Sequence, residues 1–212
     1  MSRLEVNALS ISLDGYGAGP FQDEGNPLGV GGTRLHEWIF ATKSGREMIG
    51  EPGGSEGVDN DVFRRGFVDV GATIMGRNMF GPVRGPWRDS EWRGWWGDHP
   101  PFHHAVFVLT HFERPSIAVD DTTFHFVTEG LDAALARARE VAGDDVVGLG
   151  GGVRTVRAFL DARLVDELHL AVVPIRLESG ERLLEVGEWP SGYECSSVTE
   201  GEGATHYVLV RT

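Results

Sequence analysis

Cysteine and long apolar runs are scarce in this sequence. Cys195 is the single cysteine among 212 residues, which excludes an intrachain disulfide and a multi-cysteine metal site. No window approaches the roughly 18 consecutive apolar residues of a membrane-spanning helix, and the N-terminal "MSRLEVNALSISLDG" lacks the apolar core of a signal peptide. We therefore expect a cytoplasmic protein in a reducing compartment, with no membrane partner.

Basic residues are also few. The 19 Lys and Arg residues are outnumbered by 32 Asp and Glu residues, so the formal net charge is −13. No nucleic-acid partner is expected, because neutralising a phosphate backbone needs a basic face. Lys43 is the only lysine, which excludes a Walker-type phosphate loop at the glycine cluster described below. A small anionic ligand needs only a local group of donors and stays possible.

The apolar pattern predicts a single α/β domain over residues 1–212. Helices and strands alternate from residue 71 to residue 175, which favours a largely parallel, buried sheet with right-handed crossovers. Residues 191–212 form two alternating runs joined by "EGEGA", which predicts an antiparallel hairpin at the sheet edge. Strands are predicted at residues 4–13, 71–75, 105–110, 123–128, 145–150 and 164–175, and helices at 33–41, from 59, at 130–142 and at 153–162.

The segments before residue 71 are less regular. Residues 16–32 and 44–60 are rich in glycine and are predicted to be loops. Residues 33–41 predict a short helix with Thr33 as its N-cap and Leu35, Trp38 and Ile39 on its buried face. The later helix at 130–142 is expected to bury Leu131, Leu135, Ala138 and Val141.

Four of the six tryptophans fall within residues 87–96. This segment either forms an aromatic wall of a ligand site or packs on the core or on a partner subunit.

Three consecutive glycines, Gly150, Gly151 and Gly152, lie between a predicted strand and a predicted helix. The first N–H groups of a helix lack partners and its dipole is positive there, so a phosphate can approach a glycine backbone at this point. The alternative is a tight turn that binds nothing. The dinucleotide fingerprint G-x-G-x-x-G fails at Val153, so a Rossmann site is excluded.

A second candidate anion site follows the predicted strand at 71–75. Gly76 and Arg77 come directly after that strand, and Thr110 and His111 close the strand at 105–110. The carboxyl ends of neighbouring parallel strands meet at one edge of a sheet, where two such turns can flank a single ligand. An arginine there can bind a phosphate.

Five segments together resemble a known family: "SLDGYGAG", "TIMGRNMF", "VFVLTH", "VGLGGGVRTVRAFLDARLVDELHLAVVPIRLESGERLL" and "THYVLVR". They resemble the dihydrofolate reductase-like fold, specifically stand-alone relatives of the C-terminal reductase domain of riboflavin biosynthesis. The resemblance implies a three-layer fold and an NADPH-dependent reductase. Its hydride acceptor would be a small heteroaromatic, imine or carbonyl compound.

The same resemblance implies a cofactor site. The turns at residues 76–79 and 150–155 are expected to bracket the pyrophosphate. Arg77, Thr110 and His111 are expected near the adenosine 2′-phosphate, which favours NADPH over NADH. The first strand and the loop after it would cover the nicotinamide. The expected cofactor-binding residues are Ser10, Gly17, Ala18, Gly76, Arg77, Asn78, Met79, Leu109, Thr110, His111, Leu149, Gly150, Gly151, Gly152, Val153, Arg154 and Thr155.

Asp59 is the candidate catalytic residue. Dihydrofolate reductase has a buried carboxylate that opens the helix before its Met-Gly-Arg strand, four residues ahead of an aromatic residue. Asp59 and Phe63 reproduce that spacing, so Asp59 would bind the substrate or relay a proton. The alternative is an acid that complements the helix dipole.

Three expectations complete the sequence-based hypothesis. No metal site is expected, because His99, His103 and His104 lack the spacing of a metal-binding set. A homodimer is expected, since apolar strands lie near a sheet edge. The alternative to a reductase is a non-catalytic nucleotide-binding sensor or scaffold.

Overall fold

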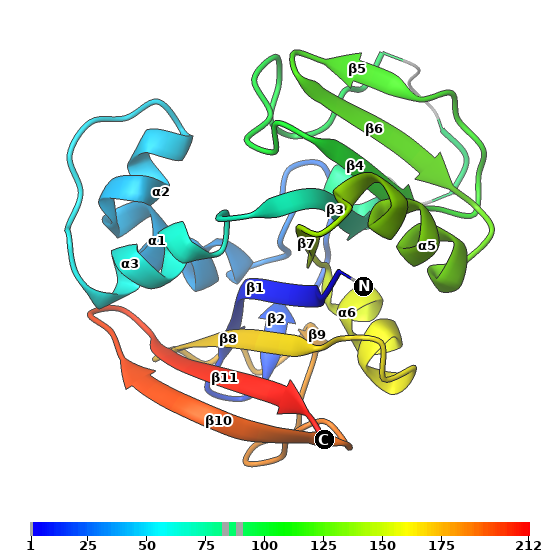
Figure 1. Cartoon of the computed structure of the whole chain (residues 1–212). Helices are drawn as coiled ribbons and strands as arrows, with labels where there is room; N and C mark the ends of the chain where they lie inside the picture. Colours follow the sequence, from blue (N-terminus) through cyan, green and yellow to red (C-terminus); the bar gives the residue numbers. More distant parts are fainter. Residues whose placement is uncertain (1, 82–84, 88–90) are drawn as a thin grey trace.

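The computed structural model of this protein describes residues 2–81, 85–87 and 91–212. Within them, nine strands form one sheet in the order β10-β11-β8-β1-β7-β3-β4-β6-β5. Figure 1 shows the C-terminal hairpin at one end of the sheet and β5 at the other. The strands are β1 (Leu4–Ser12), β3 (Val70–Gly76), β4 (Ala105–Leu109), β5 (Ile117–Val119), β6 (Thr122–Val127), β7 (Val146–Leu149), β8 (Glu167–Val173), β10 (Tyr193–Glu200) and β11 (Thr205–Arg211).

The middle of the sheet is parallel. β1 pairs with β7 and β8, β3 with β7 and β4, and β4 with β6, all in parallel. β11 runs antiparallel to β8, and β10 antiparallel to β11. The predicted parallel sheet with a C-terminal antiparallel hairpin is therefore confirmed. β5, which pairs antiparallel with β6, was not predicted, because three residues are too few to show an alternating pattern.

Helices lie in the connections from β1 to β3, from β6 to β7 and from β7 to β8, whereas β4 and β6 are connected through β5. The crossovers from β6 to β7 and from β7 to β8 run along the sheet in the direction opposite to that from β1 to β3. Right-handed crossovers then place the helices on opposite faces, which is the expected three-layer arrangement. The helices are η1 (a 3₁₀ turn, Gly32–His36), α1 (Glu37–Ala41), α2 (Lys43–Met48), α3 (Val58–Arg65), α4 (Arg77–Phe80), α5 (Leu131–Ala142) and α6 (Val153–Asp161).

The segments before residue 71 required corrections. Thr33 is not an N-cap, because the chain first forms the 3₁₀ turn after Gly31, whose φ is 75°, and α1 begins only at Glu37. Residues 44–60 are not one loop, since they contain most of α2 and the start of α3. Gly45 caused the wrong prediction: a Cβ there would lie 2.0 Å from the Ile39 carbonyl oxygen, so this glycine permits helix packing.

Part of the predicted loop at 16–32 is also ordered. Its first residues form β2 (Tyr16–Ala18), which pairs with β9 (Glu181–Arg182) in a separate two-stranded sheet. The partner strand is more than 160 positions away in the sequence, so local pattern could not reveal the pairing.

The two long helices bury the faces that their sequences suggest, with one exception. In α6 the buried residues are Val153, Val156, Phe159 and Leu160, as predicted. In α5 the buried stripe passes through Ala134, Leu135, Ala138 and Ala142, whereas Val141 is 54% exposed. The Val141 prediction was wrong because small alanines, rather than the larger valine, allow α5 to pack closely on β3 and β4. Among the described residues, no helix combines the length and apolar character that a membrane crossing requires.

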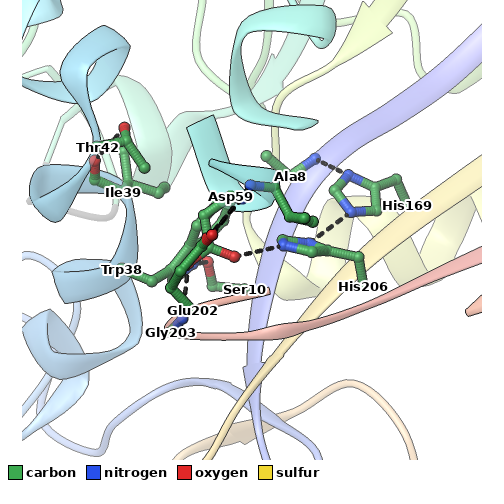
Figure 2. Close-up of polar contacts among 11 residues, drawn as sticks. Ala8, Ser10, Trp38, Ile39, Thr42, Asp59, His169, Glu202, Gly203 and His206 are labelled. Carbon is green, nitrogen blue, oxygen red and sulfur yellow. Dashed lines mark hydrogen bonds and ion pairs between the residues drawn. The ribbon is translucent and has the colours of Figure 1, made fainter. Parts of the chain in front are cut away.

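A buried hydrogen-bond chain joins the C-terminal hairpin to β1 and α3 (Figure 2). Ala8 N–H donates to His169 Nδ1 (3.0 Å), and His169 Nε2 lies 3.1 Å from His206 Nδ1. His206 Nε2 in turn lies 2.8 Å from Asp59 Oδ1, and Gly203 N–H donates to Asp59 Oδ2 (2.7 Å). Because the Ala8 N–H needs an acceptor, the hydrogen of neutral His169 sits on Nε2 and points to His206. β1 is irregular at this point: Ala8 has a φ of 53°, and the register with β8 shifts between Val6 and Leu9.

Burial, followed by the His206 and Arg65 charges, lowers the pKa of His169 from 6.5 to about 4. Between these two pH values, His169 is therefore neutral in the folded protein and protonated in the unfolded chain. The contribution of neutral His169 to the free energy of unfolding is complete above pH 6.5 and is lost as the pH falls toward 4.

We predict that His169→Gln flattens the pH dependence of stability. From pH 7 to pH 5, the free energy of unfolding of the wild type should fall by about 2 kcal/mol more than that of the variant. Urea unfolding at several pH values measures this difference. His99→Gln, at a solvent-exposed histidine, is the control and should keep the wild-type slope. Equal slopes for the wild type and His169→Gln would contradict the prediction.

Candidate functional site

A cavity of about 910 Å³ opens where β3, β4 and β7 end. Gly76 ends β3, Thr110 follows β4 and Gly150 follows β7, and all three residues line the cavity. This is the edge at which parallel sheets place their ligands. The volume is at the upper end of the range for small-molecule and cofactor sites.

Two glycine turns meet at this edge. Gly76 N–H donates to the Gly151 carbonyl, and Gly150 N–H donates to the Ile74 carbonyl, both at 2.8 Å. A Cβ at Gly76 would lie 2.2 Å from Thr155 Oγ1, and one at Gly150 would lie 3.2 Å from the Met79 side chain. These two glycines are therefore explained by the contact between the turns, without a ligand.

Gly151 and Gly152 differ from these two. Gly151 has a φ of 116°, which favours glycine, and the peptide bond between Gly151 and Gly152 is cis. A Cβ added at Gly152 would meet no atom within 4 Å, although this residue lines the cavity. Gly152 is also the N-cap of α6, where no side-chain cap is present, so the first N–H groups of that helix stay available to a ligand. Open space beside free donors is the arrangement that an anion requires.

The β1–β2 turn is held rigidly beside α6. Asp14 accepts hydrogen bonds from Ser12 Oγ (2.6 Å), Glu178 N–H (2.8 Å) and Leu177 N–H (3.2 Å). Burial alone would raise the pKa of Asp14, but these hydrogen bonds outweigh it and lower the pKa below its ordinary value. A Cβ at Gly17 would lie 2.7 Å from Val153 Cγ2, so β2 approaches the start of α6 as closely as a glycine allows.

Arg77 forms a cationic part of the wall. Its guanidinium carbon lies 3.4 Å from the centroid of the Trp87 ring, and Nη1 donates to the Gly81 carbonyl (3.3 Å). Burial and then the Arg114 charge lower the pKa of Arg77 to about 10, which still leaves it charged at neutral pH. The Arg77 Nε atom is buried and has no hydrogen-bond partner among the described residues.

The tryptophan-rich segment contacts both the cavity and the core. Trp95 and Trp96 line the cavity. Trp87, Trp92 and Trp96 also pack on a cluster that includes buried Phe80. Residues 88–90 lie outside the described residues.

Almost all of the predicted cofactor residues meet at this cavity. Ser10, Gly17, Ala18, the residues from Gly76 to Met79, those from Leu109 to His111 and those from Gly150 to Thr155 all line it. Leu149 does not: it is 1% exposed and its side chain belongs to the main core. Successive side chains of a strand face opposite sides, so this last residue of β7 points into the core.

Asp59 is not among the described residues that line the cavity. It is 3% exposed, and both carboxylate oxygens are engaged by His206 and Gly203. The hydrogen-bond chain of Figure 2 reaches the cavity wall indirectly, through Trp38. The Trp38 ring lies against His206, and its Nε1 donates to Ser10 Oγ (2.9 Å). This geometry places Asp59 behind the wall.

Sequence reasoning missed one whole side of the cavity. This side comes from residues 22–40, which run from the loop after β2 into α1, and glycines and prolines obscure any periodicity in that loop. The sequence carries no local pattern that marks these residues as a group. The missed residues of this segment are Gln22, Pro27, Leu28, Thr33, His36 and Phe40.

His36 is unusual in this group. Its Nδ1 atom is buried and has no hydrogen-bond partner among the residues that the structure describes. Burial lowers the pKa of His36 to about 4, so the imidazole is neutral at pH 7. The described residues contain no group of three or more His, Cys, Asp or Glu side chains that could hold a metal ion.

Comparisons with known proteins agree with this geometry. A family model described as the RibD C-terminal domain matches residues 6–202. A putative riboflavin biosynthesis protein from Shewanella sp. PV-4 is 22% identical, with a TM-score of 0.63, and the match covers 100% of this chain and 99% of that chain. A dihydrofolate reductase from Enterococcus faecalis is 16% identical, with a TM-score of 0.49, over 99% of this chain and 96% of that one.

A further solved structure is longer than this chain. It is a diaminohydroxyphosphoribosylaminopyrimidine deaminase/5-amino-6-(5-phosphoribosylamino)uracil reductase from Thermotoga maritima, 13% identical with a TM-score of 0.54. The match covers 100% of this chain but only 57% of that protein. The search of curated proteins gives no match. Since the family model spans most of the sequence, the chain belongs to the RibD C-terminal domain family, a reductase-like family with a dihydrofolate reductase-like fold.

Proposed function

We propose that this protein is an NADPH-dependent reductase that transfers a hydride to a small heteroaromatic, imine or carbonyl compound. The observation that carries the proposal is the open space at Gly152 beside the uncapped start of α6, in a cavity of about 910 Å³. Packing alone does not require a glycine at this position, because a Cβ there would meet no atom within 4 Å.

The residues present fit the pyrophosphate and the 2′-phosphate of NADPH. Gly152 and the first N–H groups of α6 would receive the pyrophosphate. Arg77 keeps its charge in a chain of net charge −13, and stacking on Trp87 fixes its plane. A guanidinium held in this way, with Thr110 and His111 on the same cavity, would bind the 2′-phosphate that distinguishes NADPH from NADH.

The nicotinamide would lie by Ser10, Gly17 and Ala18, which form the opposite part of the cofactor site. Ser10 is 2% exposed, and its hydroxyl accepts from Trp38 Nε1, so its own hydrogen is directed by that bond. When bound, the cofactor supplies the hydride. The protein's part is to hold the two reactants in contact and to exclude water, for which apolar walls and a rigid β1–β2 turn are suited.

The sensor alternative has less support. A protein that only binds a nucleotide needs no space beyond it. This cavity continues along side chains of the segment 22–40 that the predicted cofactor site does not include. We propose a substrate compartment there, which favours turnover. A homodimer and a cytoplasmic location remain part of the proposal, and sedimentation equilibrium tests the former.

We predict that Arg77→Gln weakens NADPH binding about 10- to 100-fold and NADH binding less than about 3-fold, since a charge-assisted hydrogen bond contributes about 1.5–3 kcal/mol. Fluorescence titration of the purified protein with each nucleotide measures both affinities. Arg137→Gln, at an arginine away from the cavity that pairs with Glu129, is the control and should bind both nucleotides like the wild type. Equal weakening of NADPH and NADH would remove Arg77 from the 2′-phosphate site, and no binding of either nucleotide would end the reductase proposal.

A second prediction separates packing glycines from ligand glycines. Gly152→Ala should weaken NADPH binding about 10-fold or more without lowering the melting temperature, because its methyl group would project into open cavity space. Gly76→Ala should lower the free energy of unfolding by about 1–3 kcal/mol, because its methyl group would clash with Thr155. Thermal unfolding and NADPH titration of both variants measure the two effects. Wild-type NADPH affinity in a stable Gly152→Ala protein would place the pyrophosphate elsewhere.

A further inference from the structure

The tryptophans of residues 87–96 do not all have the same surroundings. Trp87, Trp92 and Trp96 pack on the core cluster that includes Phe80. Trp95 does not belong to that cluster, yet it lines the cavity. Among the described residues of this segment, it is the one tryptophan whose place on the cavity is not explained by packing on the core. Its half-buried indole is therefore available to a molecule in the cavity.

Trp95 is held in place by Trp92. The two rings meet edge to face, with their centroids 4.9 Å apart and an interplanar angle of 85°. Trp92 is itself anchored, because its Nε1 donates to the carbonyl of buried Phe80 (2.9 Å) and its own carbonyl accepts from Arg114 Nη2 (2.6 Å). The surface that Trp95 offers is thus fixed before a ligand arrives, which reduces the entropy lost on binding.

The same anchor places Trp95 close to Arg77. A Cβ at Gly81 would lie 2.9 Å from Arg77 Nη1 and 2.9 Å from Trp92 Nε1, so the guanidinium and the Trp92 indole converge on this glycine. Trp95 packs against that indole, and both Trp95 and Arg77 line the cavity. The two side chains are therefore neighbours on one wall, with Trp92 next to each of them.

The proposed 2′-phosphate site at Arg77 decides which part of the cofactor comes near Trp95. In NADPH, the 2′-phosphate and the adenine are attached to adjacent carbon atoms of one ribose. A phosphate bound by Arg77 therefore brings the adenine to this wall, whereas the nicotinamide, beyond the pyrophosphate, belongs with Ser10 and Gly17. Adenine is flat and uncharged, and such a base stacks on an indole without needing hydrogen bonds to its edge.

We propose that Trp95 is the adenine-binding residue of the cofactor site: its indole packs against the base of an adenine dinucleotide, while Arg77 binds the 2′-phosphate. This inference rests on the proposed reductase function. It assigns affinity for both NADPH and NADH to Trp95, and the preference for NADPH to Arg77. The tryptophan-rich segment then contributes to ligand binding through Trp95 and supports Arg77 through Trp87.

The test uses four ligands that contain different parts of the cofactor. NADPH and NADH both contain adenine, adenosine 2′,5′-bisphosphate is an adenosine with the 2′-phosphate but no nicotinamide, and reduced nicotinamide mononucleotide has no adenosine. Each is titrated into the full-length protein by calorimetry. We expect Trp95→Ala to weaken the binding of the three adenine compounds by a similar factor of about 10, and to change the affinity for the reduced mononucleotide by less than about 2-fold.

Two variants serve as matched controls. Trp95→Phe keeps an aromatic ring and should retain more NADPH affinity than Trp95→Ala. Trp189 is 41% exposed, packs on Tyr207 and is not among the described residues that line the cavity, so Trp189→Ala should leave all four affinities unchanged. Melting temperatures identify any variant that fails to fold. The ratio of NADPH to NADH affinity should be the same in Trp95→Ala as in the wild type, whereas Arg77→Gln should lower it.

The outcomes separate the two proposals. Unchanged affinity for NADPH and for the bisphosphate in a folded Trp95→Ala protein would overturn the adenine subsite, and so would a loss confined to the reduced mononucleotide. Either result leaves the reductase proposal standing if the wild type binds NADPH. Binding of the bisphosphate that depends on Trp95, in a protein that does not bind NADPH, would keep the adenine subsite and remove the reductase function. A wild type that binds none of the four ligands would overturn both.

Discussion

Two backbone hydrogen bonds, from Gly76 to Gly151 and from Gly150 to Ile74, join the turns after β3 and β7. They depend on the absence of side chains, because a Cβ at Gly76 would reach Thr155 Oγ1. The turns belong to neighbouring parallel strands, so their contact sets the position of the α6 start relative to Arg77. The geometry of the proposed phosphate site follows from this contact, and the rest of the cavity is built around it.

The cavity combines a cationic wall with an acidic protein. A net charge of −13 would repel a phosphorylated ligand at long range, but that repulsion is screened within about a Debye length. At short range, Arg77 and the helix N–H groups dominate, and burial strengthens their interaction with an anion. Stacking between Arg77 and Trp87 also explains why tryptophans are concentrated here: the same segment fills a core cluster and supports the guanidinium.

The buried chain of Figure 2 supports the cavity from behind. It connects β1, β8, β11 and α3 through polar groups that satisfy one another, and partly satisfied chains of this kind are costly. Trp38 extends it to Ser10 on the wall. The C-terminal hairpin thereby influences the part of the cavity where we place the nicotinamide, although none of its described residues lines the cavity.

The sequence by itself determined the parallel sheet, the terminal hairpin, the buried face of α6 and the two glycine turns. Each of these shows as a pattern among residues that are close together in the sequence. Tertiary structure decided which glycine is needed for packing and which faces open space, since that depends on residues brought from distant strands. It also decided what two pairs of residues with the same spacing contact. Asp59 precedes Phe63, and His36 precedes Phe40, by four residues each. Only the folded chain shows that the hairpin tip covers the start of α3 through Glu202 and Gly203, while His36, at the end of the 3₁₀ turn before α1, lines the cavity. Local spacing fixes which side chains share a helical face, but the packing of distant elements fixes what that face meets.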